Sequence, residues 1–246
     1  MSRRIDNPLL SRPRRSCLYV PGANARALEK AKSLPADAFI LDLEDAVAPK
    51  AKADAREAIR NAVGDRAYGA REVLIRANGL ETEWGQDDLE MAASVGVDGV
   101  LVPKITSGDD ICVADQCLND AGAVPDLGLW AMIETPLAIL NIGEIAAASS
   151  DTRLTGFVIG TNDLAKELNA VPTADRRGFI FSLSAALAAA RAYHLAAIDG
   201  VCNDINNDEA LSAECEQGRV LGFDGKTLIH PSQIDTANRV FSPSEA

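Results

Sequence analysis

The sequence lacks the features that define several common classes of protein. It has no apolar run near the roughly 20 residues that a membrane-spanning helix needs. Its first 15 residues contain five arginines but no apolar segment, so a secretory signal peptide is not expected. The patterns HExxH, GxSxG and GxxxxGK[ST] are missing, which argues against zinc hydrolases, serine hydrolases and P-loop enzymes.

Cysteine and histidine are sparse. The five cysteines form no CxxC pair and are odd in number, which predicts free thiols in a reducing compartment and a cytoplasmic location. Of the two histidines, His194 is expected at a helix end, where a solvated or dipole-pairing role is favoured. His230 directly follows the last predicted strand, and there a structural hydrogen bond is favoured over a role in the site.

Positive charge is also scarce. The 24 Lys and Arg residues stand against 36 Asp and Glu residues, so the formal net charge is −12. This balance argues against a nucleic-acid partner, which needs a basic face, and the sequence does not indicate a membrane partner. A small anionic substrate remains compatible, because local arginines or a metal ion set the field inside a cleft. Apolar residues make up 47% of the chain, which is enough for one large core.

Apolar strand patterns alternate with helical patterns eight times. Strands are predicted at 17–20, 38–43, 72–75, 99–103, 127–133, 155–159, 197–201 and 226–229. Helices are predicted at 25–34, 51–63, 86–95, 109–120, 136–148, 163–168 with 177–193, 209–221 and 232–241. This order predicts an α/β fold of the (β/α)8 TIM-barrel type, with a single domain at residues 16–246 and a flexible N-terminal arm at residues 1–15. A doubly wound open sheet is the alternative, although it often has a glycine-rich first turn that is missing here.

An aspartate flanked by small or apolar residues precedes three of the predicted strands. These residues are Asp37, Asp98 and Asp224. Their position places them at the N-terminal end of the barrel, where we expect them to hold turns and not to take part in catalysis.

Many strands run apolar and then stop on a charged residue. A buried parallel strand is apolar on both faces, so such a residue must reach solvent, a partner or a ligand. Glu134 and Asp163 follow the fifth and sixth strands, which are neighbours in a barrel. Two carboxylates there suit one Mg²⁺ ion, which commonly takes one or two protein carboxylates and leaves other positions to water and substrate. The alternative is a pair of solvated or hydrogen-bonded loop acids.

Arg76 ends the third strand, where its guanidinium could bind a carboxylate or a developing enolate oxygen. The alternative is a structural ion pair with Glu44 or Asp45, which follow the second strand. These two carboxylates could hold metal-bound water or orient Arg76. Lys104 follows the fourth strand, and for it an ion pair and a substrate contact are equally open.

Several motifs occur in a fixed order along the chain. They are SCLYVPG at 16–22, LDLEDAVAP at 41–49, IRAN at 75–78, VPK at 102–104, IET at 133–135, GTNDL at 160–164 and GFDGKTLIHP at 222–231. In these motifs the chain resembles the HpcH/HpaI aldolase/citrate lyase family, and its citrate lyase β-subunit-like branch in particular. The resemblance spans roughly residues 16–241.

The resemblance implies that Glu134 and Asp163 bind Mg²⁺ and that Arg76, with Glu134, contacts substrate. It also implies a TIM-barrel enzyme, commonly a homotrimer or hexamer, that cleaves or forms a carbon–carbon bond beside a carbonyl. Some relatives continue into a C-terminal lid that supplies an acidic catalytic residue, and because this sequence stops soon after its last predicted helix, we expect no lid. The general acid or base is then Glu44, Asp45, a metal-bound water or a group from a neighbouring subunit.

We therefore expect a metal-dependent carbon–carbon lyase. Its expected substrate is a 3-hydroxyacyl-CoA or related thioester, cleaved to or formed from a 2-oxo acid such as oxaloacetate or glyoxylate on Mg²⁺. Arg76 is expected to stabilise the enolate of the other fragment. Two alternatives remain: a CoA-independent class II aldolase acting on a 4-hydroxy-2-oxo acid, and a subunit of an acyl-carrier-dependent lyase complex.

Overall fold

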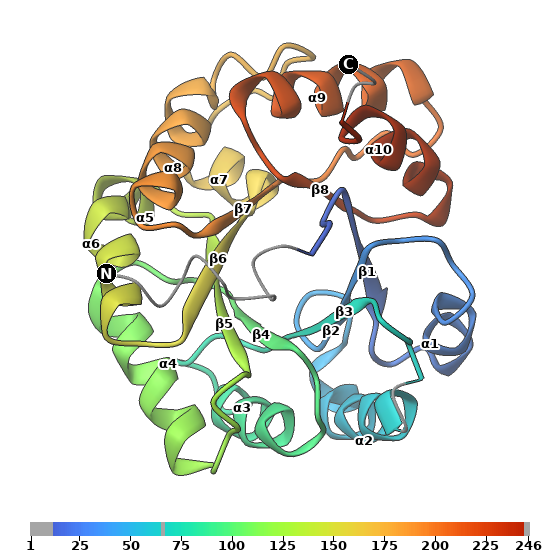
Figure 1. The fold of residues 1–246 in the computed structure, drawn as a ribbon, viewed down its shortest axis with the longest axis vertical. Coiled ribbons are helices and arrows are strands. Elements are labelled where there is room, and N and C mark those ends of the chain that lie inside the picture. The colour runs from blue at the N-terminus through green and yellow to red at the C-terminus, as the bar shows by residue number, and fades with distance from the viewer. Residues whose placement is uncertain (1–11, 65–66, 244–246) are drawn as a thin grey trace.

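Eight parallel strands close into a barrel in which each strand pairs with the next and β8 pairs with β1 (Figure 1). The strands are β1 (Ser16–Pro21), β2 (Ala38–Asp42), β3 (Glu72–Arg76), β4 (Gly99–Val102), β5 (Gly128–Ile133), β6 (Leu154–Ile159), β7 (Ala196–Asp199) and β8 (Gly225–Leu228). This computed structural model describes residues 12–64 and 67–243. The closed sheet confirms the predicted (β/α)8 barrel and excludes the open doubly wound sheet.

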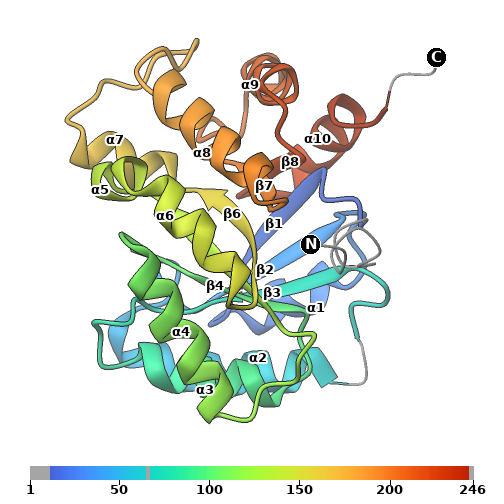
Figure 2. The ribbon, with the colours of Figure 1, turned by 60° about the vertical axis from the view of Figure 1, so that its left-hand side comes forward.

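Helices surround the barrel (Figures 1 and 2). They are α1 (Ala25–Ala31), α2 (Lys52–Val63), α3 (Gly85–Ser94), α4 (Gly108–Asp120), α5 (Pro136–Leu140), α6 (Ile142–Ala147), α7 (Thr161–Glu167), α8 (Ile180–Ala192), α9 (Asp208–Leu221) and α10 (Ile234–Val240). The helix predicted at 136–148 is divided into α5 and α6 at Asn141, which has ψ 10°. The side-chain amide of Asn141 donates to the carbonyl of Thr106 at 2.8 Å, which ties the break to the β4–α4 connection. Within the described part of the chain, no helix has the length and apolar character needed to cross a membrane.

The apolar core has two layers, one inside the barrel and one between the strands and the helices. In β1, Leu18 and Val20 pack in the outer layer, whereas Cys17 and Tyr19 belong to the barrel interior. The same period of two continues into the ends of other strands. Three polar side chains lie two positions after an interior residue and therefore point toward the barrel axis. They are Asp42 after Ile40, Arg76 after Leu74, and Glu134 after Met132.

The N-terminal end of the barrel is closed by buried charge. Arg14 donates from Nη2 to Oε1 of Glu72 at 2.8 Å, and its guanidinium lies 5.1 Å from the ring centroid of Trp130. Both charged side chains are less than 6% exposed. In barrels of this type ligands bind at the opposite, C-terminal end.

The three repeated aspartates lie at this same closed end, as predicted. Each accepts a backbone N–H and also pairs with an arginine: Asp37 with Arg15, Asp98 with Arg12, and Asp224 with Arg191. Two of these arginines attach the end of the N-terminal arm to the barrel. Residues 1–11 of the arm lie outside the described residues, so the division into a flexible arm and one domain stays a prediction.

Candidate active site

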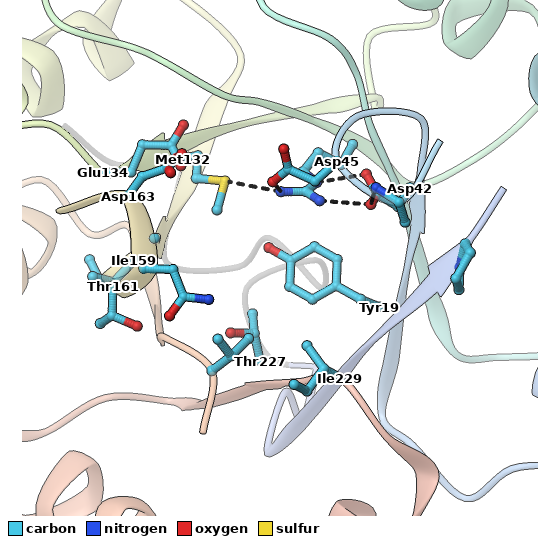
Figure 3. A pocket seen from close by; sticks show the side chains of 16 residues that line it. Tyr19, Asp42, Asp45, Met132, Glu134, Ile159, Thr161, Asp163, Thr227 and Ile229 are labelled. Atoms are coloured by element: carbon cyan, nitrogen blue, oxygen red, sulfur yellow. Dashed lines mark hydrogen bonds and ion pairs between the residues drawn. The ribbon is translucent and has the colours of Figure 1, made fainter. Parts of the chain in front are cut away.

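The C-terminal ends of the strands surround a cavity of about 360 Å³ (Figure 3). Tyr19 contributes from β1, Met132 from β5 and Thr227 from β8. Four acidic side chains line the cavity against one basic side chain: Asp42, Asp45, Glu134 and Asp163 against Arg76. A cavity with this balance repels anions unless further positive charge is bound in it.

The two carboxylates predicted to bind metal meet on one wall of this cavity (Figure 3). Glu134 directly follows β5, and the hydroxyl of Thr135 caps the next helix, α5. Asp163 lies in the first turn of α7, after β6. Glu134 is only 1% exposed, whereas the side chain of Asp163 is 33% exposed. A Cβ at Gly160 would lie 2.5 Å from that of Glu134, so a glycine is needed to leave room for the carboxylate.

Lys104 holds these two carboxylates together. Its backbone N–H donates to Oε1 of Glu134 at 2.8 Å, and its ammonium pairs with Asp163 and lies 3.4 Å from the same Oε1. Lys104 has φ 57°, a left-handed conformation that is uncommon for a residue with a side chain. Of the two roles left open by the sequence, the structure shows the ion pair.

The two carboxylates differ in acidity. Burial raises the pKa of Glu134 to about 7, against the opposing effect of Lys104. Burial also acts to raise the pKa of Asp163, but hydrogen bonding and the charge of Lys104 outweigh it and hold that pKa below its usual value. A buried carboxylate with a raised pKa is stabilised when a cation binds beside it.

This donor set fits a hard divalent cation. Glu134 and Asp163 supply oxygen ligands, which Mg²⁺ prefers, and the cavity leaves room for water and substrate. Among residues 12–64 and 67–243, no three or more His, Cys, Asp or Glu side chains gather as a ready metal site. Two carboxylates are enough for Mg²⁺, because this ion commonly takes one or two protein carboxylates and fills its other positions with water and substrate.

Arg76 lies on the cavity wall, but three carboxylates surround it. Its Nε and Nη2 donate to the two carboxylate oxygens of Asp42, both at 2.7 Å. Its Nη1 lies 2.9 Å from Glu44 and 3.3 Å from Asp45. The ion pairs weighed in the sequence are therefore present, and Asp42 is an additional, bidentate partner. A substrate anion at Arg76 must compete with Glu44 and Asp45, the two weaker contacts.

Glu44 and Asp45 differ in environment, although they are neighbours in sequence. The side chain of Glu44 is 14% exposed, and burial raises its pKa to about 8 despite the nearby Arg76. Arg76 compensates it incompletely because the guanidinium is already shared with Asp42. The side chain of Asp45 is 75% exposed. Glu44 can therefore exchange a proton near neutral pH, as a general acid or base must.

Other polar residues divide into those at the site and those away from it. Nδ1 of His230 accepts the backbone N–H of Ser232 at 3.2 Å, which is a structural hydrogen bond. His194 lies just beyond α8 with φ 56°. Asp42 and Tyr19 also line the cavity, although no role was predicted for either residue. Asp42 could have been found, because it continues the inward positions Ala38 and Ile40 and would otherwise be an unpaired buried charge.

The fold and the site together define a class of protein: a (β/α)8 barrel with a pair of carboxylates and an arginine at the C-terminal ends of its strands. The sequence pattern of the HpcH/HpaI aldolase/citrate lyase family matches residues 15–231. The chain belongs to this family, as its motifs suggested.

The chain is similar to several named proteins. It is 50% identical over 234 residues to a (3S)-malyl-CoA thioesterase of Cereibacter sphaeroides, with 95% of this chain and 79% of the relative covered. It is 36% identical over 243 residues to the citrate lyase subunit beta of Escherichia coli, with 96% and 79% covered. Among solved structures, the citrate lyase beta subunit of M. tuberculosis complexed with oxaloacetate and magnesium superimposes with a TM-score of 0.80 at 29% identity, covering 95% of this chain and 99% of that one. The two sequence relatives bear the names of an enzyme and of an enzyme subunit.

Proposed function

We propose that this protein is a Mg²⁺-dependent carbon–carbon lyase that acts on a short 3-hydroxyacyl-CoA thioester of the malyl-CoA type. The observation that carries the proposal is the joint presence, in one cavity, of the Glu134–Asp163 carboxylate pair and Arg76. The names of the relatives support the thioester, and the magnesium and oxaloacetate in the related crystal structure support the cation and the 2-oxo acid.

Glu134 and Asp163 are the proposed Mg²⁺ ligands. When bound, Mg²⁺ would supply Lewis-acid polarisation of a substrate oxygen. It would also offset the acidic lining, which otherwise disfavours a carboxylate or a phosphate-bearing CoA ester. Glu134 is therefore the proposed contact to the substrate through the cation.

Arg76 is the proposed second anchor, with Glu44 and Asp45 beside it as proton-transfer groups. Its guanidinium faces the cavity from β3 and can stabilise negative charge that develops on the acyl fragment. Glu44 contacts Arg76 but does not itself line the cavity. Its pKa of about 8 leaves it mostly protonated at neutral pH, and in the ionised fraction it can accept the proton of the substrate hydroxyl and return it to carbon. Asp45 is exposed and can exchange that proton with solvent.

Two reactions of the same thioester are chemically compatible with these groups. In lyase chemistry, removing the 3-hydroxyl proton breaks the C2–C3 bond, and the resulting enolate takes up a proton to give acetyl-CoA and glyoxylate. In hydrolysis, water adds to the thioester carbonyl and the C–S bond breaks, giving malate and free CoA thiol. The relatives named (3S)-malyl-CoA thioesterase favour this second candidate.

Product analysis with (3S)-malyl-CoA tests both candidates. The purified protein is incubated with Mg²⁺ or with EDTA, glyoxylate is trapped as its phenylhydrazone, and free thiol is measured with Ellman's reagent. Glyoxylate without thiol is the expected lyase result, and thiol without glyoxylate indicates the thioesterase. Neither activity in wild type, or full activity of Glu134→Gln and Asp163→Asn variants, would contradict the proposal. Aldol activity on a free 4-hydroxy-2-oxo acid, or activity only with an acyl carrier protein, would favour the remaining alternatives.

The cytoplasmic location and the homotrimeric or hexameric state remain predictions. Size-exclusion chromatography with light scattering measures the oligomeric state of the purified chain directly.

A further inference from the structure

Tyr19 has a buried hydroxyl for which residues 12–64 and 67–243 provide no hydrogen-bond partner. Its side chain extends from β1 into the cavity, with the hydroxyl toward the centre (Figure 3). Buried tyrosine hydroxyls usually find a partner, because an unpaired polar group in a protein interior is unfavourable. An orphaned hydroxyl directed into a cavity indicates a partner that arrives with the ligand.

The position of this hydroxyl is fixed by the barrel. Tyr19 lies in β1, where it is paired with Ile40 of β2. The guanidinium of Arg76 lies 4.8 Å from the centroid of its ring, a cation–π contact that holds the ring plane. Burial raises the pKa of Tyr19, so the hydroxyl remains protonated and can donate at any pH the enzyme meets.

Two other donors that line the cavity, Arg76 and Thr227, are already engaged. Nε and Nη2 of Arg76 donate to Asp42, and its Nη1 faces Glu44. The hydroxyl of Thr227 donates to the backbone carbonyl of Asp199 at 3.0 Å. The Tyr19 hydroxyl differs from these groups because its proton is not committed to another protein atom of the described chain.

We propose that the Tyr19 hydroxyl donates a hydrogen bond to the thioester carbonyl oxygen of the substrate. This inference rests on the proposed function and names the group that receives the developing charge. In the lyase reaction that oxygen becomes the enolate oxygen, and in hydrolysis it becomes the oxyanion of the tetrahedral adduct. The same donor therefore serves either reaction, and Arg76 beside the ring adds its positive charge.

The Tyr19→Phe variant tests the proposal because it removes one oxygen atom and keeps the ring under Arg76. Steady-state kinetics with (3S)-malyl-CoA and Mg²⁺ should show kcat lowered on the order of 10²-fold, as expected for loss of one oxyanion donor, with a much smaller change in KM. The Tm of the ligand-free variant should equal or exceed that of wild type, since the lost hydroxyl has no partner in the described structure.

Tyr68→Phe is the matched control. Tyr68 is also buried, at 2% exposure, but its hydroxyl donates to the carbonyl of Leu28 at 3.1 Å, away from the cavity. This variant should show the opposite pattern, a Tm lowered by roughly 2–4 °C with kcat unchanged.

The outcomes distinguish the role of Tyr19 from the proposed function. A Tyr19→Phe enzyme with wild-type kcat, or one whose Tm falls as in Tyr68→Phe, overturns the role of Tyr19 alone. Wild-type protein without turnover of the thioester overturns the proposed function, and the role of Tyr19 with it.

Discussion

Glu44 makes the stability of the free enzyme depend on pH in a way that one substitution can remove. It is the third carboxylate on a guanidinium that Asp42 already binds through two hydrogen bonds, and burial raises its pKa from 4.5 to about 8. In the window between these values, the folded protein keeps a proton at Glu44 that the unfolded chain has lost. Stability associated with Glu44 is therefore present below pH 4.5 and is lost as the pH rises toward 8.

The magnitude follows from linkage. One proton held by the folded state alone changes the free energy of unfolding by about 1.4 kcal/mol per pH unit. Across the two units between pH 5 and pH 7, the contribution of Glu44 is thus at most about 3 kcal/mol. Glu44→Gln carries no titrating proton and can still accept a hydrogen bond from Arg76. The variant should match wild type near pH 5 and become progressively more stable than wild type toward pH 8.

Urea unfolding in EDTA, measured at each pH from 5 to 8, gives this difference directly. Asp45→Asn is the control, because Asp45 contacts the same guanidinium at 3.3 Å from a position that is 75% exposed. It should keep most of the pH dependence of wild type, because Glu44 remains buried, with a modest reduction because the charge of Asp45 helps to raise the pKa of Glu44. Parallel curves for wild type and Glu44→Gln would mean that Arg76 keeps Glu44 ionised throughout, and would refute the reasoning.

Two further predictions concern buried and bridging lysines. Lys226 is fully buried between Asp199 at 3.1 Å and Glu214 at 3.0 Å. Lys226→Met should therefore lower the free energy of unfolding, measured in urea, by about 3–5 kcal/mol, and adding Glu214→Gln should restore part of this loss. An unchanged unfolding midpoint would contradict the prediction. Lys104→Met removes the ammonium between Glu134 and Asp163, so Mg²⁺ should bind about tenfold or more tightly by calorimetry. Lys166→Met is the control, because it removes an exposed cation that acts on Asp163 less strongly than Lys104 does, and it should change the Mg²⁺ affinity much less. Equal effects of the two substitutions would show that the ammonium of Lys104 does not compete with Mg²⁺ for Glu134 and Asp163.

The architecture was accessible from the sequence because it depends on repeated patterns. Each strand is a short apolar run, and eight such runs alternating with helical patterns leave few folds other than the barrel. The split of the helix predicted at 136–148 was not accessible, because it depends on a hydrogen bond from Asn141 to Thr106, 35 residues away. A helix boundary that depends on a contact between residues far apart in the sequence cannot be predicted from the local pattern of apolar residues.

The candidate site was accessible in part for the same reason. Neighbouring strands bring Glu134 and Asp163 together, so their proximity follows from order along the chain. The bidentate Asp42–Arg76 pair and the position of Lys104 depend on side-chain geometry. Lys104 in particular reaches both carboxylates from a left-handed backbone conformation, with φ 57°.

The two ends of the barrel use aspartate and glutamate in opposite ways. At the N-terminal end, Asp37, Asp98 and Asp224 each meet an arginine and a backbone N–H, so their charge is neutralised within the protein. At the C-terminal end, burial raises the pKa values of Glu44 and Glu134, and the nearby Arg76 and Lys104 offset this only in part. The first arrangement adds stability without inviting a ligand. The second leaves buried carboxylates that are unfavourable to ionise, and a cation bound beside them would stabilise the folded protein.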